Sequence, residues 1–290
     1  MKALLAALAL TASSAALAQG KPLDPALPND AVEIMRKLQC GPGDGIPAIY
    51  RWAGHVYSRV EGERDRHLFD IEGMNIRQCV ALSDPKRGRG YRMVSRELML
   101  YLDPATGAVV RQWKNPWTQE TVDLFHVAND PVNSRPTFAF AEDGKPYSVP
   151  MKRMGDWLLM PVEVPLFYKN PLAGDYQDHV GNHYHAMEIF DFAMPVRAAL
   201  DPRTKDINGT VSWVRLSDWL PWMKMGGRAG GMVHNAVGTK VARFEDLPAV
   251  LKDEIARSYP TYNAPPPLDD QRPNATSWTE FRKKIDAQKK

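Results

Sequence analysis

The sequence predicts a mainly β fold, in which one large antiparallel sheet is closed or nearly closed into a lipocalin-like barrel, with helices at both ends. Two observations support this. Between residues 42 and 240, short runs rich in Val, Ile, Trp, Tyr and Phe are separated by Gly, Pro, Asn and Asp. No helical pattern of about ten or more residues interrupts them, which disfavours an α/β fold. A barrel would hide the strand edges and provide a mouth for a ligand, and a two-sheet sandwich is the alternative.

A hairpin is the clearest strand pair. Residues 91–102 and 108–113 flank a turn in which Pro104 fixes φ and Gly107 can adopt a positive φ. Further runs of the same composition predict the remaining strands. These are residues 49–59, 68–79, 121–127, 157–164, 183–192, 209–216 and 232–241.

Helical periodicity appears near the two ends of the chain. Asn29 can cap a helix whose residues 31, 34, 35 and 38 form one apolar stripe. Asp246 can cap a second helix over residues 247–255. Residues 277–280 (SWTE) form a capping box for a last helix, which follows an extended linker at residues 260–267.

Composition and charge limit the classes of function. The 290 residues are 44% hydrophobic and 24% charged, as in globular proteins that bury a core, and the net charge of +3 gives no expectation of nucleic-acid binding. Residues 1–18 combine Lys2, a short apolar run and a small-residue cleavage site, which predicts a secretory signal peptide. We therefore expect residues 19–290 to form a single β-rich domain, periplasmic or secreted, with no stable membrane insertion.

The two cysteines, Cys40 and Cys79, both belong to the part predicted to be exported. Oxidising conditions outside the cytoplasm allow them to form a disulfide, which would close a loop of about forty residues. Two separate buried thiols are the alternative.

Histidines cluster at one place in the chain. His179, His183 and His185 lie shortly before Glu188, and on a regular strand His183 and His185 point to the same face. We expect both to project into one enclosed cavity. A His-x-His pair could hold Zn, Fe or Mn, with His179 as a further ligand. Because Glu188 lies an odd number of residues from both, a metal would need a bulge or a ligand from another strand.

A metal-free site is a second interpretation of the same cluster. His183 or His185 would be the general base, because imidazole titrates near neutral pH, and Glu188 or Asp130 would orient it or act as the acid. Three plainer roles compete: partly exposed histidines on a polar strand, an ion pair of Glu188 with an arginine such as Arg215 or Arg197, and a turn role for Asp130 in Asn-Asp-Pro.

Aromatic residues supply the predicted substrate contacts. Trp213 and Trp222 precede a glycine-rich stretch at residues 226–231, and large flat side chains beside a flexible loop would suit a flat or apolar ligand. Tyr184 and His126 are further predicted substrate contacts. The alternative is that these side chains belong to the core.

Several short motifs carry a family resemblance. They are residues 113–118 (WKNPWT), 129–133 (NDPVN), 188–192 (EIFDF), 212–213 (SW), 220–226 (LPWMKMG) and 259–262 (YPTY). In their order and spacing they resemble the bacterial domain-of-unknown-function family 1838 over nearly the whole mature chain. The resemblance implies one domain and implies no activity or catalytic residues.

Together these features predict an exported enzyme that acts on a small, partly apolar or aromatic molecule by His/Glu acid–base chemistry of the lyase or hydrolase type. Such chemistry needs no organic cofactor. A lipocalin-like periplasmic binding protein for an apolar ligand is the first alternative, and a His-x-His metal-dependent β-barrel enzyme is the second. The sequence does not indicate an oligomeric state.

Overall fold

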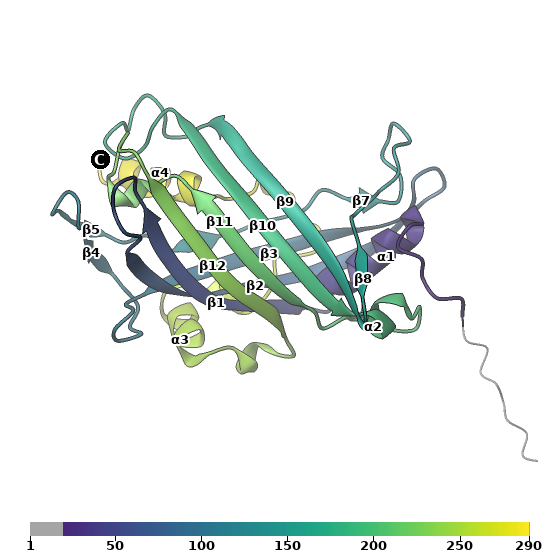
Figure 1. Cartoon of the computed structure of the whole chain (residues 1–290). Coiled ribbons are helices and arrows are strands. Elements are labelled where there is room, and N and C mark those ends of the chain that lie inside the picture. The colour runs from purple at the N-terminus through teal and green to yellow at the C-terminus, as the bar shows by residue number, and fades with distance from the viewer. Residues whose placement is uncertain (1–19, 290) are drawn as a thin grey trace, which may run out of the picture.

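The computed structural model describes residues 20–289, so the predicted signal peptide lies outside the described residues (Figure 1). Its main feature is a 10-stranded antiparallel sheet with the order β6-β3-β2-β1-β12-β11-β10-β9-β8, in which β7 also pairs with β3. The long strands are β1 (Ala48–Arg59), β2 (His67–Asp84), β3 (Gly88–Leu102), β9 (Trp157–Lys169), β10 (His183–Pro195), β11 (Thr210–Ser217) and β12 (Gly231–Val241). The short ones are β6 (Val127–Asn129), β7 (Thr137–Phe138) and β8 (Lys152–Met154), while β4 (Gln112–Lys114) and β5 (Thr121–Asp123) form a separate pair. The predicted antiparallel, mainly β fold is confirmed.

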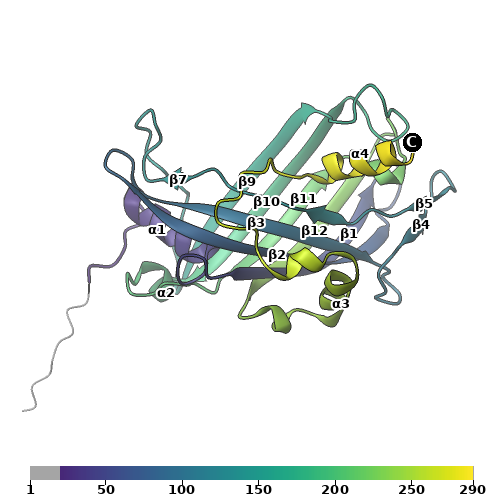
Figure 2. The same ribbon diagram turned by 180° about the vertical axis from the view of Figure 1, so that it is seen from behind.

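The sheet curls into a trough with two arms. Strands β1 to β3 form one arm and β9 to β12 the other. Strands β2 and β3 cross behind β9 to β11 in Figure 1 and in front of them in Figure 2, which is seen from the opposite side. Within residues 20–289, no hydrogen-bonded ladder joins β6 or β7 at one edge to β8 at the other. The sheet is therefore not closed into the barrel that the sequence predicted.

Helices cover one arm and both ends of the trough. They are α1 (Pro28–Gln39), α2 (Val196–Leu200), α3 (Ala249–Ser258) and α4 (Ser277–Ala287), with 3-10 turns η1 (Pro221–Met223), η2 (Phe244–Asp246) and η3 (Pro260–Asn263). Leu251 of α3 belongs to the apolar cluster that Leu98 and Leu100 form on the outer face of β3, whereas Trp278 and Phe281 of α4 belong to the core inside the trough. Figure 2 shows α1 at one end of the trough and α4 at the other. None of the described helices is both long and apolar enough to cross a membrane.

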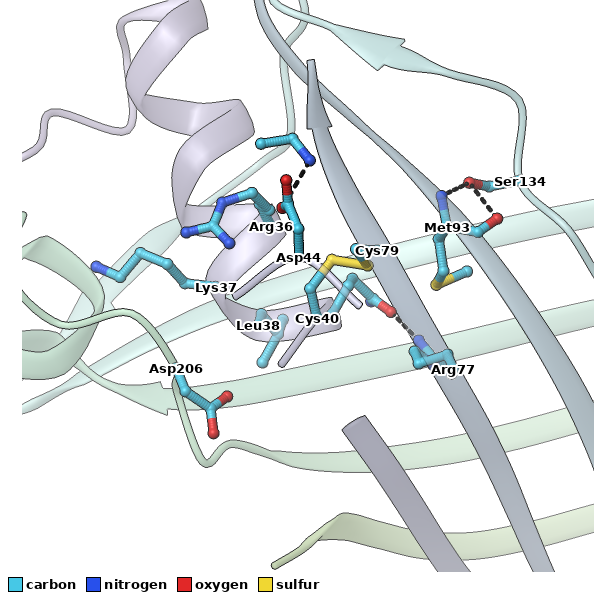
Figure 3. Close-up of a disulfide and its surroundings, with 12 residues drawn as sticks. Arg36, Lys37, Leu38, Cys40, Asp44, Arg77, Cys79, Met93, Ser134 and Asp206 are labelled. Atoms are coloured by element: carbon cyan, nitrogen blue, oxygen red, sulfur yellow. Dashed lines mark hydrogen bonds between the residues drawn. A yellow bond between two sulfur atoms is a disulfide. The ribbon is translucent and has the colours of Figure 1, made fainter. Parts of the chain in front are cut away.

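The end of α1 is fixed to the sheet. Cys40 follows the helix and forms a disulfide with Cys79 on β2, with 5.7 Å between their Cα atoms, which confirms the predicted pairing (Figure 3). Asp44 accepts a hydrogen bond from the backbone N–H of Ala81 (2.9 Å), so the loop after the helix is held on the same strand. Tyr50 donates its hydroxyl hydrogen to the carbonyl oxygen of Leu38 (2.6 Å). The C-terminus of α1 therefore closes this end of the trough.

Two strand predictions fail beyond the hairpin turn. Gly107 adopts a positive φ of 69°, as the turn requires. Of the predicted second strand, only Val109 bridges back to Leu102, and residues 112 and 113 belong to β4, which is outside the main sheet. The chain then leaves the sheet, because Trp113 packs on Phe69 and Trp222 with ring centroids 5.6 and 5.7 Å away. The predicted strand over residues 121–127 is likewise divided into β5 and β6.

The predicted helix caps also differ. Helix α1 begins at Pro28, and Asn29 instead accepts a hydrogen bond from the backbone N–H of Arg89 (2.8 Å). Asp246 ends the 3-10 turn η2, and α3 begins only after Pro248. The capping box of α4 joins Thr276 to Thr279, one residue earlier than predicted.

Candidate functional site

A cavity of about 220 Å³ lies between the two arms, on the inner face of the sheet. One wall comes from β1, β2, β3 and β6, the other from β10, β11 and β12, and α4 contributes its first residue. On neighbouring antiparallel strands, paired residues that face inward lie side by side across the sheet. Side chains distant in sequence therefore come together on the inner face. The polar and charged members of this surface include Asn75, Arg77, Glu97, Asn129, Glu188 and Arg215.

An ion pair lies on the arm formed by β9 to β12. Glu188 of β10 stands opposite Arg215 of β11, which stands opposite His234 of β12. Arg215 Nη1 lies 3.3 Å from Glu188 Oε1, and its Nη2 donates to the hydroxyl oxygen of Tyr184. The guanidinium is thus held in a fixed orientation at the cavity wall, and the predicted pairing of Glu188 with Arg215 is present.

A second carboxyl group lines the cavity from the opposite arm. Glu97 lies on β3, where Asn129 Nδ2 donates to its Oε1 over 3.4 Å. Burial raises the pKa of Glu97, and the negative charge of Glu188 raises it further, against the opposing effect of Arg215. The cavity therefore holds two carboxyl groups in different settings, since Glu188 is paired with a guanidinium and Glu97 has a pKa raised by burial.

Aromatic rings form the apolar part of the cavity wall. Trp213 stacks on Phe190 with ring centroids 6.4 Å apart. Trp52 lies flat against Gly73 of β2, where an added Cβ would come within 2.2 Å of the indole Cε2. On its other side Trp52 pairs with Gly238 of β12, so both neighbouring strands present glycine to it. The missing side chain at Gly73 makes room for the indole ring, whereas an added Cβ at Gly238 would approach the Trp52 Cβ (3.2 Å).

Several buried polar atoms around the cavity have no hydrogen-bond partner within residues 20–289. Three are donors on residues that line the cavity, namely Nε1 of Trp52, Nε1 of Trp213 and Nε of Arg215. The side-chain oxygen of Asn129 is an unpaired acceptor. Buried polar groups in proteins are nearly always hydrogen-bonded, so these unpaired groups on residues of the cavity wall are candidates for contact with water or with a polar ligand.

His234 lies next to this polar row and is almost completely buried, with 2% of its surface exposed. Burial, and then the positive charge of Arg215, lower the pKa of His234 to about 3. The imidazole is therefore neutral at neutral pH.

Comparison with known proteins places the chain in a family. Residues 45–285 match the family model described as "Protein of unknown function (DUF1838)". The chain belongs to this family. The matched region contains both arms of the trough and every residue that lines the cavity. A comparison with curated proteins finds no match.

In this DUF1838 chain, the histidines that the sequence singled out lie outside the cavity. His183 and His185 do point to the same face of β10, as predicted, but both are exposed, and Phe167 packs against both rings. They line two separate pockets, so the expectation that one enclosed cavity receives both is wrong. Glu188 faces the opposite side of the strand, because it lies an odd number of residues from each.

The predicted metal ligands do not come together either. His179 uses Nδ1 to donate to the carbonyl oxygen of Pro221 (2.9 Å). Within residues 20–289, three ligand atoms of His, Cys, Asp or Glu approach within 4.8 Å of one another only at His55, His67 and Asp70.

The remaining predicted residues divide between wall and core. Trp213 lines the cavity. Tyr184 is buried, does not line the cavity, and accepts a hydrogen bond from Arg215 through its hydroxyl oxygen. Trp222 is a core residue that packs on Phe69, Tyr101 and Trp113, which favours the core alternative for this tryptophan.

Two further predicted residues have structural partners. His126 is buried, and its Nδ1 accepts the backbone N–H of Tyr101 (3.1 Å). Asp130 pairs with Arg96 (2.9 Å) and Arg272 (2.8 Å) just after β6, which favours a structural role for this residue.

Sequence reasoning missed Glu97, Trp52 and Asn129. A signal for Glu97 was present, because it is an acidic residue directly before the apolar run of residues 98–102 in a predicted strand. When both faces of a strand are covered, a charged side chain that points inward usually has a pairing partner or a functional role.

Proposed function

We propose that this protein binds a small, partly apolar or aromatic molecule in the cavity between the two arms and acts on it by acid–base chemistry. Glu97 and Glu188 exchange protons with the bound molecule, in a reaction of the lyase or hydrolase type. The observation that carries the proposal is the pair of carboxyl groups in different electrostatic settings, Glu188 ion-paired with Arg215 and Glu97 without such a contact.

The unpaired donors support the binding step. Trp52 and Trp213 both line the cavity, and their indole N–H groups have no partner within residues 20–289, so a ligand with a flat body and a hydrogen-bond acceptor would suit both residues. Arg215 adds a third donor and a positive charge. A carboxylate or carbonyl on an aromatic or otherwise flat molecule fits this set of groups.

The carboxyl pair supports the chemical step. Enzymes run acid and base chemistry at one pH by placing two titratable groups in environments that push their pKa values apart. Glu97, whose pKa is raised by burial, is the candidate acid, and Glu188, which pairs with Arg215, is the candidate base. Proton transfer of this kind requires no organic cofactor.

We further propose that the protein works in the periplasm or outside the cell. The disulfide between Cys40 and Cys79 supports this, since such bonds persist in oxidising compartments, and so does the signal peptide predicted for residues 1–18.

Binding is tested with 2-naphthoate, a flat aromatic carboxylate, by isothermal titration calorimetry. We expect saturable binding that exceeds that of the cationic 2-naphthylmethylamine. The Trp52→Phe/Trp213→Phe variant keeps aromatic rings but lacks both indole N–H groups, and should bind naphthoate about tenfold or more weakly, the equivalent of one or two lost hydrogen bonds. Trp157→Phe is the matched control, because Trp157 is exposed outside the cavity. Equal affinity of the two variants would contradict the proposed binding mode.

The acid–base step is tested by a pH titration of 13C-labelled glutamate side chains followed by NMR. Glu97→Gln and Glu188→Gln assign the two signals. We expect the Glu97 carboxyl to titrate above its ordinary range of about 4.3 and to move down in Glu188→Gln, since a negative charge has been removed. A Glu97 pKa in the ordinary range would leave a lipocalin-like carrier as the function, provided that naphthoate binds.

A further inference from the structure

We propose that His55, His67 and Asp70 form a binding site for a divalent transition metal ion of the Zn²⁺ type on the outer face of the sheet. His55 lies on β1, and His67 and Asp70 lie on β2. The site is independent of the proposed acid–base function, because these side chains lie outside the cavity.

The three side chains converge on one point. His55 Nδ1 lies 2.8 Å from Asp70 Oδ1, and His67 Nε2 lies 2.8 Å from the same oxygen. The two imidazole rings meet edge to face, with centroids 5.0 Å apart. Two ring nitrogens and a carboxylate oxygen are thus aimed at one small volume from two different strands.

A β-bulge creates this convergence. Val56 pairs with Phe69, but Tyr57 pairs with His67, so Leu68 is the extra residue. In an unbroken register His67 would point inward with Phe69, away from Asp70, because successive residues alternate between faces. The bulge instead leaves both Leu68 and Phe69 buried and turns His67 outward. Bulges often re-aim a side chain at functional positions, and this one supplies the third ligand.

The chemistry of the three groups matches a metal site with an open position. Two imidazoles and one carboxylate are a known ligand set for Zn²⁺ with water as the fourth ligand. Bonds of 2.0–2.1 Å in tetrahedral geometry separate ligand atoms by about 3.3 Å, so the present 2.8 Å contacts would need to open by about 0.5 Å. His55, His67 and Asp70 keep 51%, 34% and 32% of their side-chain surface exposed, so an ion and its water have access.

Two arginines near the site have their charge balanced by a neighbouring carboxylate. Arg59 and Arg66, in and beside the loop that joins the two strands, are each paired with a carboxylate, Asp65 (2.8 Å) and Glu63 (2.9 Å) respectively. Tyr57 stacks on His67 with centroids 5.0 Å apart, which restricts the rotation of that imidazole. The ligands are thereby partly pre-organised for binding.

The experiment titrates ZnCl₂ into the purified chain, stripped with a chelator and carrying no affinity tag, by calorimetry. Co²⁺ is used in parallel, because its visible absorption reports tetrahedral coordination. The variants are His67→Gln and Asp70→Asn, with circular dichroism and urea unfolding to show that each folds. The matched control is His183→Ala/His185→Ala, which removes the other exposed histidine pair on the same outer surface.

We expect one ion per chain in the wild type and in the control variant. Loss of His67 or of the Asp70 carboxylate should weaken binding by at least the roughly 10- to 100-fold that loss of an outer-shell partner produces. The proposal is overturned if the wild type shows no saturable site, if the folded His67→Gln variant binds as tightly as the wild type, or if binding is lost in the His183/His185 control instead.

Discussion

Replacing His234 by Gln should reduce the loss of stability that the protein suffers on acidification. His234 is buried beside Arg215, and its pKa in the folded protein is lowered to about 3, whereas a histidine in the unfolded chain titrates near 6.5. Between these two values the unfolded state binds a proton that the folded state does not. The free energy of unfolding therefore falls as the pH falls through this window.

The magnitude follows from the width of the window. Each pH unit is worth about 1.4 kcal/mol per differential proton, so acidification from pH 6.5 to pH 5 should cost about 2 kcal/mol through His234. His126, whose pKa is lowered to about 4 by burial and then by Arg111, acts in the same direction. Glu97, with a raised pKa, acts in the opposite direction, because its folded form holds a proton that the unfolded form loses. Both contributions are present in wild type and variant, and so they cancel in the difference.

The assay is urea unfolding followed by tryptophan fluorescence at pH 8, 6.5 and 5, with the disulfide intact. We expect the wild type to lose about 2 kcal/mol more than His234→Gln between pH 6.5 and 5. His185→Gln, at an exposed position on the same sheet, is the control and should follow the wild type. Parallel pH profiles for wild type and His234→Gln would refute the assignment of a buried neutral imidazole.

Two further predictions concern stability and the shape of the cavity. Cys40→Ala/Cys79→Ala should lower the free energy of unfolding by about 3–4 kcal/mol, from the loop-closure entropy of a 39-residue separation, as measured by urea denaturation; an unchanged midpoint would contradict this. Gly73→Ala should displace the indole of Trp52, destabilise the protein by about 1–3 kcal/mol and weaken naphthoate binding, measured by calorimetry. Gly227→Ala, where no atom lies within 4 Å of the added methyl group, should do neither.

Much of the sheet was predictable because strand formation depends on local composition. Six of the long strands begin within three residues of their predicted starts, and β9 begins at the predicted Trp157 but continues to Lys169. The alternation rule also predicted that Glu188 faces away from His183 and His185. The same rule does not predict which face of β10 is the inner one, because that depends on how strands distant in sequence pair.

The same limit explains why most of the site was missed. Glu97 and Glu188 belong to strands at opposite sides of the sheet order, and no local pattern brings them together. The bulge at Leu68 is equally invisible in a single sequence, because it depends on a one-residue mismatch between β1 and β2. The register between strands distant in sequence is determined by which side chains pack in the core. That packing depends on many residues from different parts of the chain, so no local sequence pattern reveals it.

The open seam of the trough has a consequence for ligand exchange. Since β6 and β7 at one margin share no ladder with β8 at the other, the arms can spread without the rupture of any main-chain hydrogen bond between those margins. A ligand would then enter at this margin, while the continuous β1–β12 pairing and the main-chain hydrogen bond from Ile207 N–H to the Lys37 carbonyl oxygen (3.0 Å) hold the two arms together elsewhere.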